Sequence, residues 1–240
     1  MIQKYKNIIS LCLKVIVIIS VITGVIYSIL YGKINGYSVL LYFTTQSNIW
    51  ILIIDFIFII FMIKDFNKEH LYNYKLIKAY QVFVTCITVT GLVFCLILAP
   101  GYYLSDANIP DYTPFNFAAV LLHIVVPLLS VIDYVYFTPA ISFSKKDICW
   151  SFIPTVYYFI FAVIGYVLNW NFGDGRNYPY FFLNFDSPAG IFGFSNDMPY
   201  FMGSFYWFFV IFGIIVGLSS LYVHIMNKKF NKETMKIVYK

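Results

Sequence analysis

Polar groups interrupt two apolar stretches of the chain. The second stretch carries a histidine, His123, and the first carries five uncharged polar residues in a row: Thr44, Thr45, Gln46, Ser47 and Asn48. Polar groups at membrane depth are costly and therefore mark candidate functional sites. A threonine hydroxyl becomes nucleophilic when a nearby base removes its proton, and imidazole suits that role because its ordinary pKa is about 6.5. The pattern indicates a hydroxyl nucleophile with a histidine base.

Helical periodicity separates the two threonines. At about 100° per residue, Thr44, Ser47, Asn48 and Asp55 share one face of a helix, whereas Thr45 falls on an apolar face. We therefore expect the first face to turn toward the bundle interior. Thr44 is the expected nucleophile.

Thr44 and His123 lie at similar predicted depths in the membrane, so the two side chains could meet if their helices are neighbours. At about 1.5 Å of rise per residue, they lie roughly 8 Å and 13 Å below the outer ends of their predicted spans. Ser47, Asn48 and Gln46 are then candidates to orient the pair or to donate hydrogen bonds to an oxyanion.

Two other interpretations of this polar group stay open. Membrane-embedded Thr and Ser often bond the carbonyl four residues earlier in their own helix, and Asn or His often links neighbouring helices. On that interpretation the residues serve packing alone. Binding of a ligand or an ion is the second alternative.

A second set of charged residues lies near the inner ends of three predicted spans: Lys14, Asp55 and Asp133. Their depths are similar, and pairing of Lys14 with either aspartate would offset the cost of burying the charges. The set predicts a structural ion pair or, alternatively, a relay for protons or cations.

Several classes of site are not expected. His, Cys and acidic residues nowhere have the spacing of metal ligands, so we expect no metal and no other cofactor. A G-x-S-x-G elbow and a Gly-rich phosphate loop are also missing from the sequence. The net charge of +5 suits membrane topology and anionic headgroups, so neither nucleic acid nor a soluble partner is expected.

The elements that must hold these residues are membrane-spanning helices. The chain is 61% hydrophobic and 11% charged, far below the roughly 25% charged of soluble proteins. Six apolar stretches are long enough to cross about 30 Å of hydrocarbon. They predict one all-α membrane domain over residues 1–240, with helices at about 8–31, 39–63, 77–99, 114–137, 149–169 and 202–226.

Lysines predict that both termini are cytoplasmic. Thirteen lie on the side of the termini: Lys4, Lys6, Lys64, Lys68, Lys75, Lys78, Lys145, Lys146, Lys228, Lys229, Lys232, Lys236 and Lys240. The opposite side carries two basic residues, Lys33 and Arg176. On that outer side, Pro100-Gly101 is expected to end the third helix. The long loop at about 170–201 is rich in aromatic residues, which suit a layer of rings at the headgroups.

Three segments resemble a known family in the same order along most of the chain. They are YFTTQSNIW (42–50), LLHIVVPLLSVIDYVYF (121–137) and YPYFFLNFD (178–186). They are similar to the bacterial six-span branch of the family that contains the androgen-induced proteins and the androgen-dependent TFPI-regulating protein. Animal members are intramembrane threonine hydrolases that cleave fatty acid esters of hydroxy fatty acids. The resemblance implies Thr44 as nucleophile and His123 as base.

The expected function is therefore lipid ester hydrolysis in a membrane, with a fatty-acyl ester presented from the outer leaflet as substrate. The richness in Ile, Lys, Asn, Tyr and Phe is typical of an AT-rich, bacterial genome, which places the protein in a cytoplasmic membrane. Two other classes remain. One is a small transporter or proton or cation pathway that uses Asp55, Asp133 and Lys14, and the other is a non-catalytic lipid-binding protein.

Overall fold

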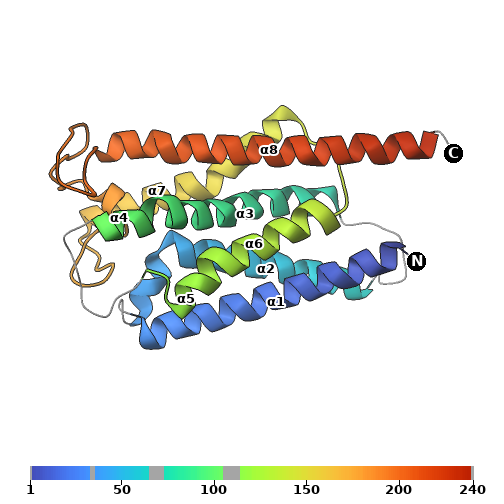
Figure 1. The fold of residues 1–240 in the computed structure, drawn as a ribbon, viewed down its shortest axis with the longest axis horizontal. Coiled ribbons are helices and arrows are strands. Elements are labelled where there is room, and N and C mark those ends of the chain that lie inside the picture. The colour runs from blue at the N-terminus through green and yellow to red at the C-terminus, as the bar shows by residue number, and fades with distance from the viewer. Residues whose placement is uncertain (1, 33–35, 65–72, 105–113, 239–240) are drawn as a thin grey trace.

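The chain folds into a bundle of long helices that run along one common axis (Figure 1). The computed structural model describes residues 2–32, 36–64, 73–104 and 114–238. Six helical spans in it are long and apolar enough to cross a membrane. The predicted all-helical membrane fold is thus confirmed. The first and last helices have their chain-terminal ends at the same end of the bundle (Figure 1), and which side of the membrane this end faces stays a prediction.

The spans are built from α-helices, some of them joined by π-helical or 3₁₀ segments. The first three spans are α1 (Ile2–Tyr31), α2 (Phe43–Lys64) and α3 (Tyr74–Val93), which continues through a π-helical segment (Phe94–Leu98) into α4 (Ala99–Leu104). The fourth comprises α5 (Phe117–Val120), a π-helical segment (Leu121–Val125), α6 (Val126–Ile132) and a second π-helical segment (Asp133–Phe137). A 3₁₀ helix (Lys145–Ser151) leads into α7 (Phe152–Val167), and α8 (Ser204–Val238) is the sixth span.

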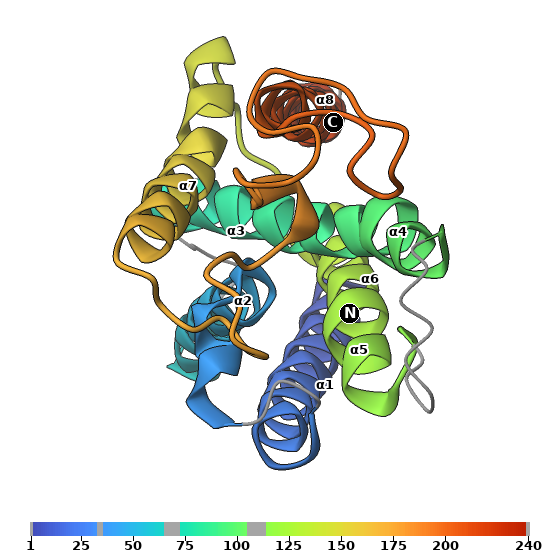
Figure 2. The ribbon, with the colours of Figure 1, turned by 90° about the vertical axis from the view of Figure 1, so that its left-hand side faces the viewer.

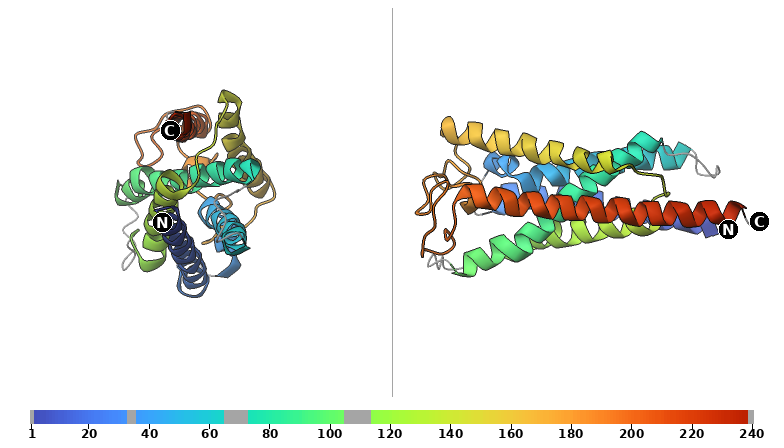
Figure 3. Two further views of the ribbon diagram at one scale, coloured as in Figure 1. Left: turned by 90° about the vertical axis from the view of Figure 1, so that its right-hand side faces the viewer. Right: turned by 90° about the horizontal axis from the view of Figure 1, so that it is seen from above.

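The third span is the centre of the bundle. α3 packs against α2, α6 and α8, and in the view along the axis it crosses the middle of the molecule (Figure 2). α7 and α8 lie on one side of it, and α1, α2, α5 and α6 lie on the other, an arrangement also visible from the opposite end (Figure 3). In its most apolar stretch 56% of the third span is buried, against 22% of the sixth, so α8 packs at the periphery.

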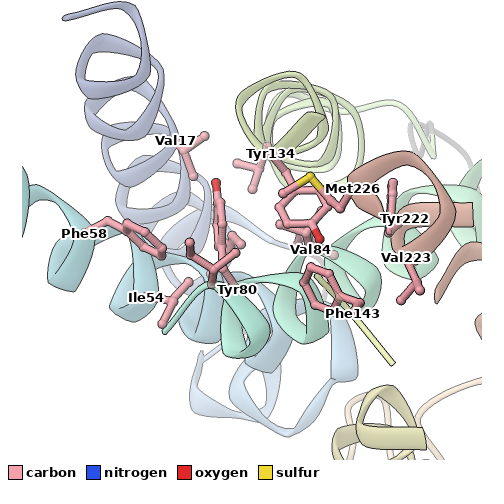
Figure 4. Close-up of a cluster of buried hydrophobic side chains, with 14 of the residues drawn as sticks. Val17, Ile54, Phe58, Tyr80, Val84, Tyr134, Phe143, Tyr222, Val223 and Met226 are labelled. Carbon is pink, nitrogen blue, oxygen red and sulfur yellow. The ribbon is translucent and has the colours of Figure 1, made fainter. Parts of the chain in front are cut away.

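Buried apolar side chains form two main clusters at successive levels of the bundle. The first gathers around Tyr80 and Tyr134, with α1, α2, α3, α6 and α8 all contributing (Figure 4). The second lies around Tyr158 and Trp207 and includes Phe182 from the loop before α8. α3 supplies residues 77–87 to the first cluster and residues 89 and 93 to the second, so one helix links the two levels.

The prediction that the third helix ends at Pro100 is wrong. Proline lacks the N–H that would continue the helical ladder. The residues before it form the wider π-helical turn, in which Ala99 N–H donates to a carbonyl five residues back. The helix then continues to Leu104. A π-helical segment likewise ends two residues before Pro127, so both prolines are accommodated by local widening.

α2 begins later than the sequence predicted. Gly36–Leu41 forms a separate 3₁₀ helix, and α2 starts at Phe43 rather than at 39. The polar run therefore occupies the first two turns of α2 and does not interrupt a longer helix. Thr44 lies at a helix N-terminus, where backbone N–H groups lack partners inside the helix.

The segment between α7 and α8 folds over the end of the bundle away from the termini, here called the loop end (Figure 1). Phe172 and Phe182 are buried, so these two rings do not join the predicted layer at the headgroups. A Cβ on Gly165 of α7 would come within 2.7 Å of the Phe172 ring. The Tyr42 hydroxyl donates to the Phe172 carbonyl at 2.7 Å, which ties the loop to the start of α2.

Candidate active site

Thr44 lies in the first turn of α2 at the loop end, with a half-buried side chain. Its backbone N–H donates to the hydroxyl of Tyr180 over 3.2 Å, so a side chain from the loop satisfies one of the helix's free amides. The helix dipole puts partial positive charge at this end. That charge favours negative charge developing on a nearby oxygen.

His123 reaches Thr44 from the fourth span. Its Nε2 lies 3.2 Å from Thr44 Oγ1, and its Nδ1 lies 3.0 Å from the carbonyl oxygen of Ala119. A carbonyl oxygen can only accept, so this bond assigns the proton of the neutral ring to Nδ1. Nε2 then carries the lone pair and accepts from the Thr44 hydroxyl. This is the arrangement of a nucleophile with its general base.

Two residues of the third span hold the imidazole in place. Phe94 stacks on His123 with ring centroids 3.9 Å apart and planes 22° apart. Gly91 lies close to the backbone of His123: a Cβ at position 91 would come within 2.8 Å of the His123 carbonyl oxygen. A small residue at this point lets the two helices approach closely. The His123 carbonyl is also the one that the missing N–H of Pro127 leaves without its helical donor.

Tyr180 is a member of the site that the sequence did not identify. Its hydroxyl lies 3.4 Å from Thr44 Oγ1 as well as 3.2 Å from the Thr44 amide. Burial raises the pKa of the Tyr180 phenol, which stays protonated at neutral pH. The sequence signal was its place in the third segment of the family resemblance, but many aromatic residues in the same loop share that signal.

Ser47 and Asn48 support the backbone of the site. The Ser47 hydroxyl lies 3.0 Å from the Thr44 carbonyl and 2.7 Å from the Thr90 hydroxyl. The Asn48 amide nitrogen donates to the carbonyls of Thr44 at 2.8 Å and Leu122 at 3.2 Å. Both side chains are fully buried. Asn48 therefore links α2 to the fourth span beside His123, which helps to fix the distance between Thr44 and His123.

The remaining two residues of the polar run point elsewhere. Gln46 donates from its amide nitrogen to the Leu40 carbonyl at 3.3 Å, back toward the preceding 3₁₀ helix. Thr45, on the apolar face of the helix, is buried as well, with 2% of its surface exposed.

Lys14, Asp55 and Asp133 meet in the bundle interior, each at most 2% exposed. The Lys14 ammonium pairs with Asp133 and lies 3.4 Å from an oxygen of Asp55. The Tyr80 hydroxyl donates to Asp133 at 2.7 Å, and the Tyr80 ring lies 4.3 Å below the ammonium. Within the described part of the chain, neither oxygen of Asp55 has a hydrogen-bond partner. In this inner charge cluster Asp133 is hydrogen-bonded, whereas Asp55 is buried with, among the described residues, only the ion pair to Lys14.

Comparisons with known proteins identify no relative of the chain: no family model, curated protein or solved structure matches it. The family resemblance therefore stays a prediction, and the case for function depends on geometry. Among the described residues, no group of three or more His, Cys, Asp or Glu side chains could hold a metal ion. The chemistry available at the loop end is that of a hydroxyl, an imidazole and a phenol.

Proposed function

We propose that the protein is an intramembrane lipid hydrolase that cleaves fatty-acyl esters, with Thr44 as nucleophile and His123 as general base. One observation carries the proposal: Thr44 Oγ1 lies 3.2 Å from a ring nitrogen whose partner nitrogen is held by the Ala119 carbonyl. The carbonyl selects the tautomer that can accept the hydroxyl proton. Thr44 therefore differs from a threonine that only bonds its own helix.

The reaction follows in two steps. Thr44 Oγ1 attacks the ester carbonyl carbon while its proton moves to His123 Nε2, and the tetrahedral intermediate collapses as Nε2 returns the proton to the leaving alcohol. Thr44 is then acylated. A water molecule next gives a proton to Nε2 and adds its oxygen to the acyl carbon. The bond to Oγ1 breaks, Thr44 regains its proton and the fatty acid leaves.

Three features support a lipid ester as the substrate. The site lies at the end of apolar spans that lipid surrounds, and the loop that covers it is rich in aromatic residues. An acyl chain can enter such a site laterally from the outer leaflet of a bacterial cytoplasmic membrane. The resemblance to hydrolases of fatty acid esters of hydroxy fatty acids favours the same class of bond.

Labelling by a fluorophosphonate probe tests the proposal on the purified protein in detergent. We expect the wild type to be labelled, and Thr44→Val and His123→Ala to remain unlabelled while keeping their helical content. Thr45→Val is the matched control, because it removes the adjacent hydroxyl and leaves Thr44 and His123 in place. Labelling of folded Thr44→Val at the wild-type rate would refute the assignment, and so would a folded wild type that never reacts.

A proton or cation pathway is a second candidate function, and Asp55 favours it. Two carboxylates share one ammonium in the inner charge cluster, and both Asp55 oxygens lack hydrogen-bond partners among the described residues. An extra buried negative charge is costly and favours uptake of a cation. Reconstituted protein would then conduct protons or cations across liposomes, and Asp55→Asn would abolish the flux. Flux that is absent from the wild type, or unchanged in Asp55→Asn, removes this candidate.

A non-catalytic lipid-binding protein is the outcome that remains if both tests fail. In that case Thr44→Val would change the stability of the bundle by about 0.5–1.5 kcal/mol, the contribution of one hydrogen bond, and nothing else.

A further inference from the structure

Thr44 Oγ1 contacts two hydrogen-bonding groups in the structure, His123 Nε2 at 3.2 Å and the Tyr180 hydroxyl at 3.4 Å. Because the Ala119 carbonyl holds the proton of Nδ1, Nε2 must accept, and the Thr44 proton points to it. The Tyr180 oxygen already accepts the Thr44 amide N–H. A phenol oxygen can accept one hydrogen bond and donate another, so the Tyr180 proton can point at Oγ1; the Tyr158 hydroxyl, which donates to the Leu41 carbonyl at 3.1 Å, is a second hydrogen-bonding neighbour of Tyr180. The order of donors is Tyr180 to Thr44 to His123 to the Ala119 carbonyl.

The side chains that the sequence offered as oxyanion donors are engaged elsewhere. Asn48 has two amide protons, and they are directed at the carbonyls of Thr44 and Leu122. The Ser47 hydroxyl has one proton, and its contacts are the Thr44 carbonyl and the Thr90 hydroxyl. Freeing the Asn48 amide would leave the buried Leu122 carbonyl without this donor, which costs free energy, and freeing the Ser47 hydroxyl would give up both of its contacts. Tyr180 is the donor that already faces the reacting oxygen.

The Tyr180 ring is held rigidly. It stacks on Phe182 with centroids 5.1 Å apart and planes 12° apart, and it meets the edge of Tyr42 at 5.5 Å. Tyr42 in turn fixes the loop through its bond to the Phe172 carbonyl. A donor held in place before the reaction stabilises developing charge without the cost of reorganisation.

We propose that Tyr180 is a further catalytic residue of this site, donating a hydrogen bond to the oxyanion of the tetrahedral intermediate; the inference rests on the proposed ester hydrolysis. When Thr44 Oγ1 bonds to the acyl carbon, the former carbonyl oxygen becomes an anion two bonds from Oγ1. The Tyr180 O–H turns from Oγ1 to that oxygen. Tyr180 keeps its proton throughout, because the transferred proton shuttles between Thr44, His123 and the leaving alcohol.

Tyr180→Phe tests this role, because it removes one hydroxyl and keeps the ring packing. We expect the kcat for a chromogenic fatty-acyl ester to fall by about 10²- to 10³-fold, as for loss of one oxyanion donor, with KM within about twofold. Binding of a trifluoromethyl ketone, which forms a tetrahedral adduct at the nucleophile, should weaken in parallel. The matched control is Tyr178→Phe in the same loop, which should keep the wild-type kcat.

A fluorinated tyrosine at position 180 gives a second measurement. Its phenol is more acidic, so the alkaline loss of kcat should move to lower pH if the proton of Tyr180 is required. An unmoved alkaline limb would contradict the inference, as would a Tyr180→Phe protein with wild-type kcat. Equal losses of kcat in the Tyr178 and Tyr180 variants would likewise reduce Tyr180 to a structural residue.

The same experiment separates failure of the inference from failure of the proposed function. If the wild type hydrolyses the ester, Thr44→Val does not and Tyr180→Phe does so fully, then only the role of Tyr180 is overturned. If the wild type shows no hydrolysis and no labelling, the proposed function fails, and the role of Tyr180 fails with it.

Discussion

The bundle buries polar groups in two places, and the two places differ in how their groups are paired. At the loop end, Thr44 and His123 are uncharged and only half-buried, and their hydrogen bonds run in one direction, from the Thr44 hydroxyl to His123 and from His123 to the Ala119 carbonyl. In the inner charge cluster, Lys14 is 2% exposed and two carboxylates and a tyrosine enclose it. A reacting atom must be reachable and must have a proton to give. The loop end meets both conditions. The inner charge cluster is fully buried, and its ion pairs link helices in the way that a structural ion pair does.

The largest effect is expected at Thr44, where a substitution should greatly reduce the rate of hydrolysis and change the stability of the protein little. Thr44→Val removes the proposed nucleophile and should lower ester hydrolysis by at least about 10⁴-fold, which corresponds to about 5.4 kcal/mol of activation free energy. The midpoint of thermal unfolding in detergent should change little, because one partly buried hydrogen bond contributes about 1 kcal/mol. If the folded variant kept activity within tenfold of wild type, Thr44 would not be the nucleophile, and the loop end would not differ from the inner charge cluster in this respect.

Lys14→Met should show the reverse pattern in the inner charge cluster. Removing the ammonium leaves two buried carboxylates without a cation, which typically costs about 3–5 kcal/mol. Stability is the readout, measured by unfolding in detergent, and kcat of the protein that remains folded should stay near wild type. Lys14→Arg keeps the charge and is the matched control. A stable Lys14→Met protein that loses catalysis would show that the two places are coupled.

Sequence alone predicted much of this contrast. Six apolar runs predicted six spans because lipid cannot hydrogen-bond to an exposed backbone. The predicted depths of Thr44 and His123 were compatible with a meeting of the two side chains if their helices are neighbours, and in the structure they lie 3.2 Å apart. In the same way, similar depth placed Lys14 near both aspartates. These inferences needed only the rise and periodicity of a helix, which lipid enforces.

The parts that sequence could not predict depend on contacts between segments far apart in the chain. The continuation of α3 past Pro100 requires a π-helical turn, whose energy depends on neighbouring helices as well as on local sequence. Tyr180 is one of many aromatic residues in a loop without helical periodicity, so no spacing rule could align it with Thr44, 136 positions away. Loop contacts decide which ring reaches the site.

Gly91→Ala should produce an intermediate effect, by moving His123 without altering any reacting group. A Cβ at position 91 would meet the His123 carbonyl oxygen at 2.8 Å, so the fourth span must shift away from α3. Displacement of a catalytic base by about 1 Å can cost roughly 10²-fold in rate. Gly217→Ala on α8 is the matched control, since nothing lies within 4 Å of its added Cβ. Equal kcat in both variants would show that the close approach at Gly91 does not position the base.

Ser47→Ala should have the smallest effect, and it distinguishes a supporting residue from an oxyanion donor. Ser47 is fully buried, and its hydroxyl contacts the Thr44 carbonyl and the Thr90 hydroxyl. Thr90 retains its bond to the Cys86 carbonyl at 3.2 Å, so the variant should lose about 0.5–1.5 kcal/mol of stability. Its kcat should stay within about threefold of wild type, because the proton of Ser47 points away from the reacting oxygen. A fall in kcat of about 10²-fold or more at unchanged KM would instead identify Ser47 as the oxyanion donor. The donor would then come from a membrane-spanning helix, α2, and not from the loop that carries Tyr180.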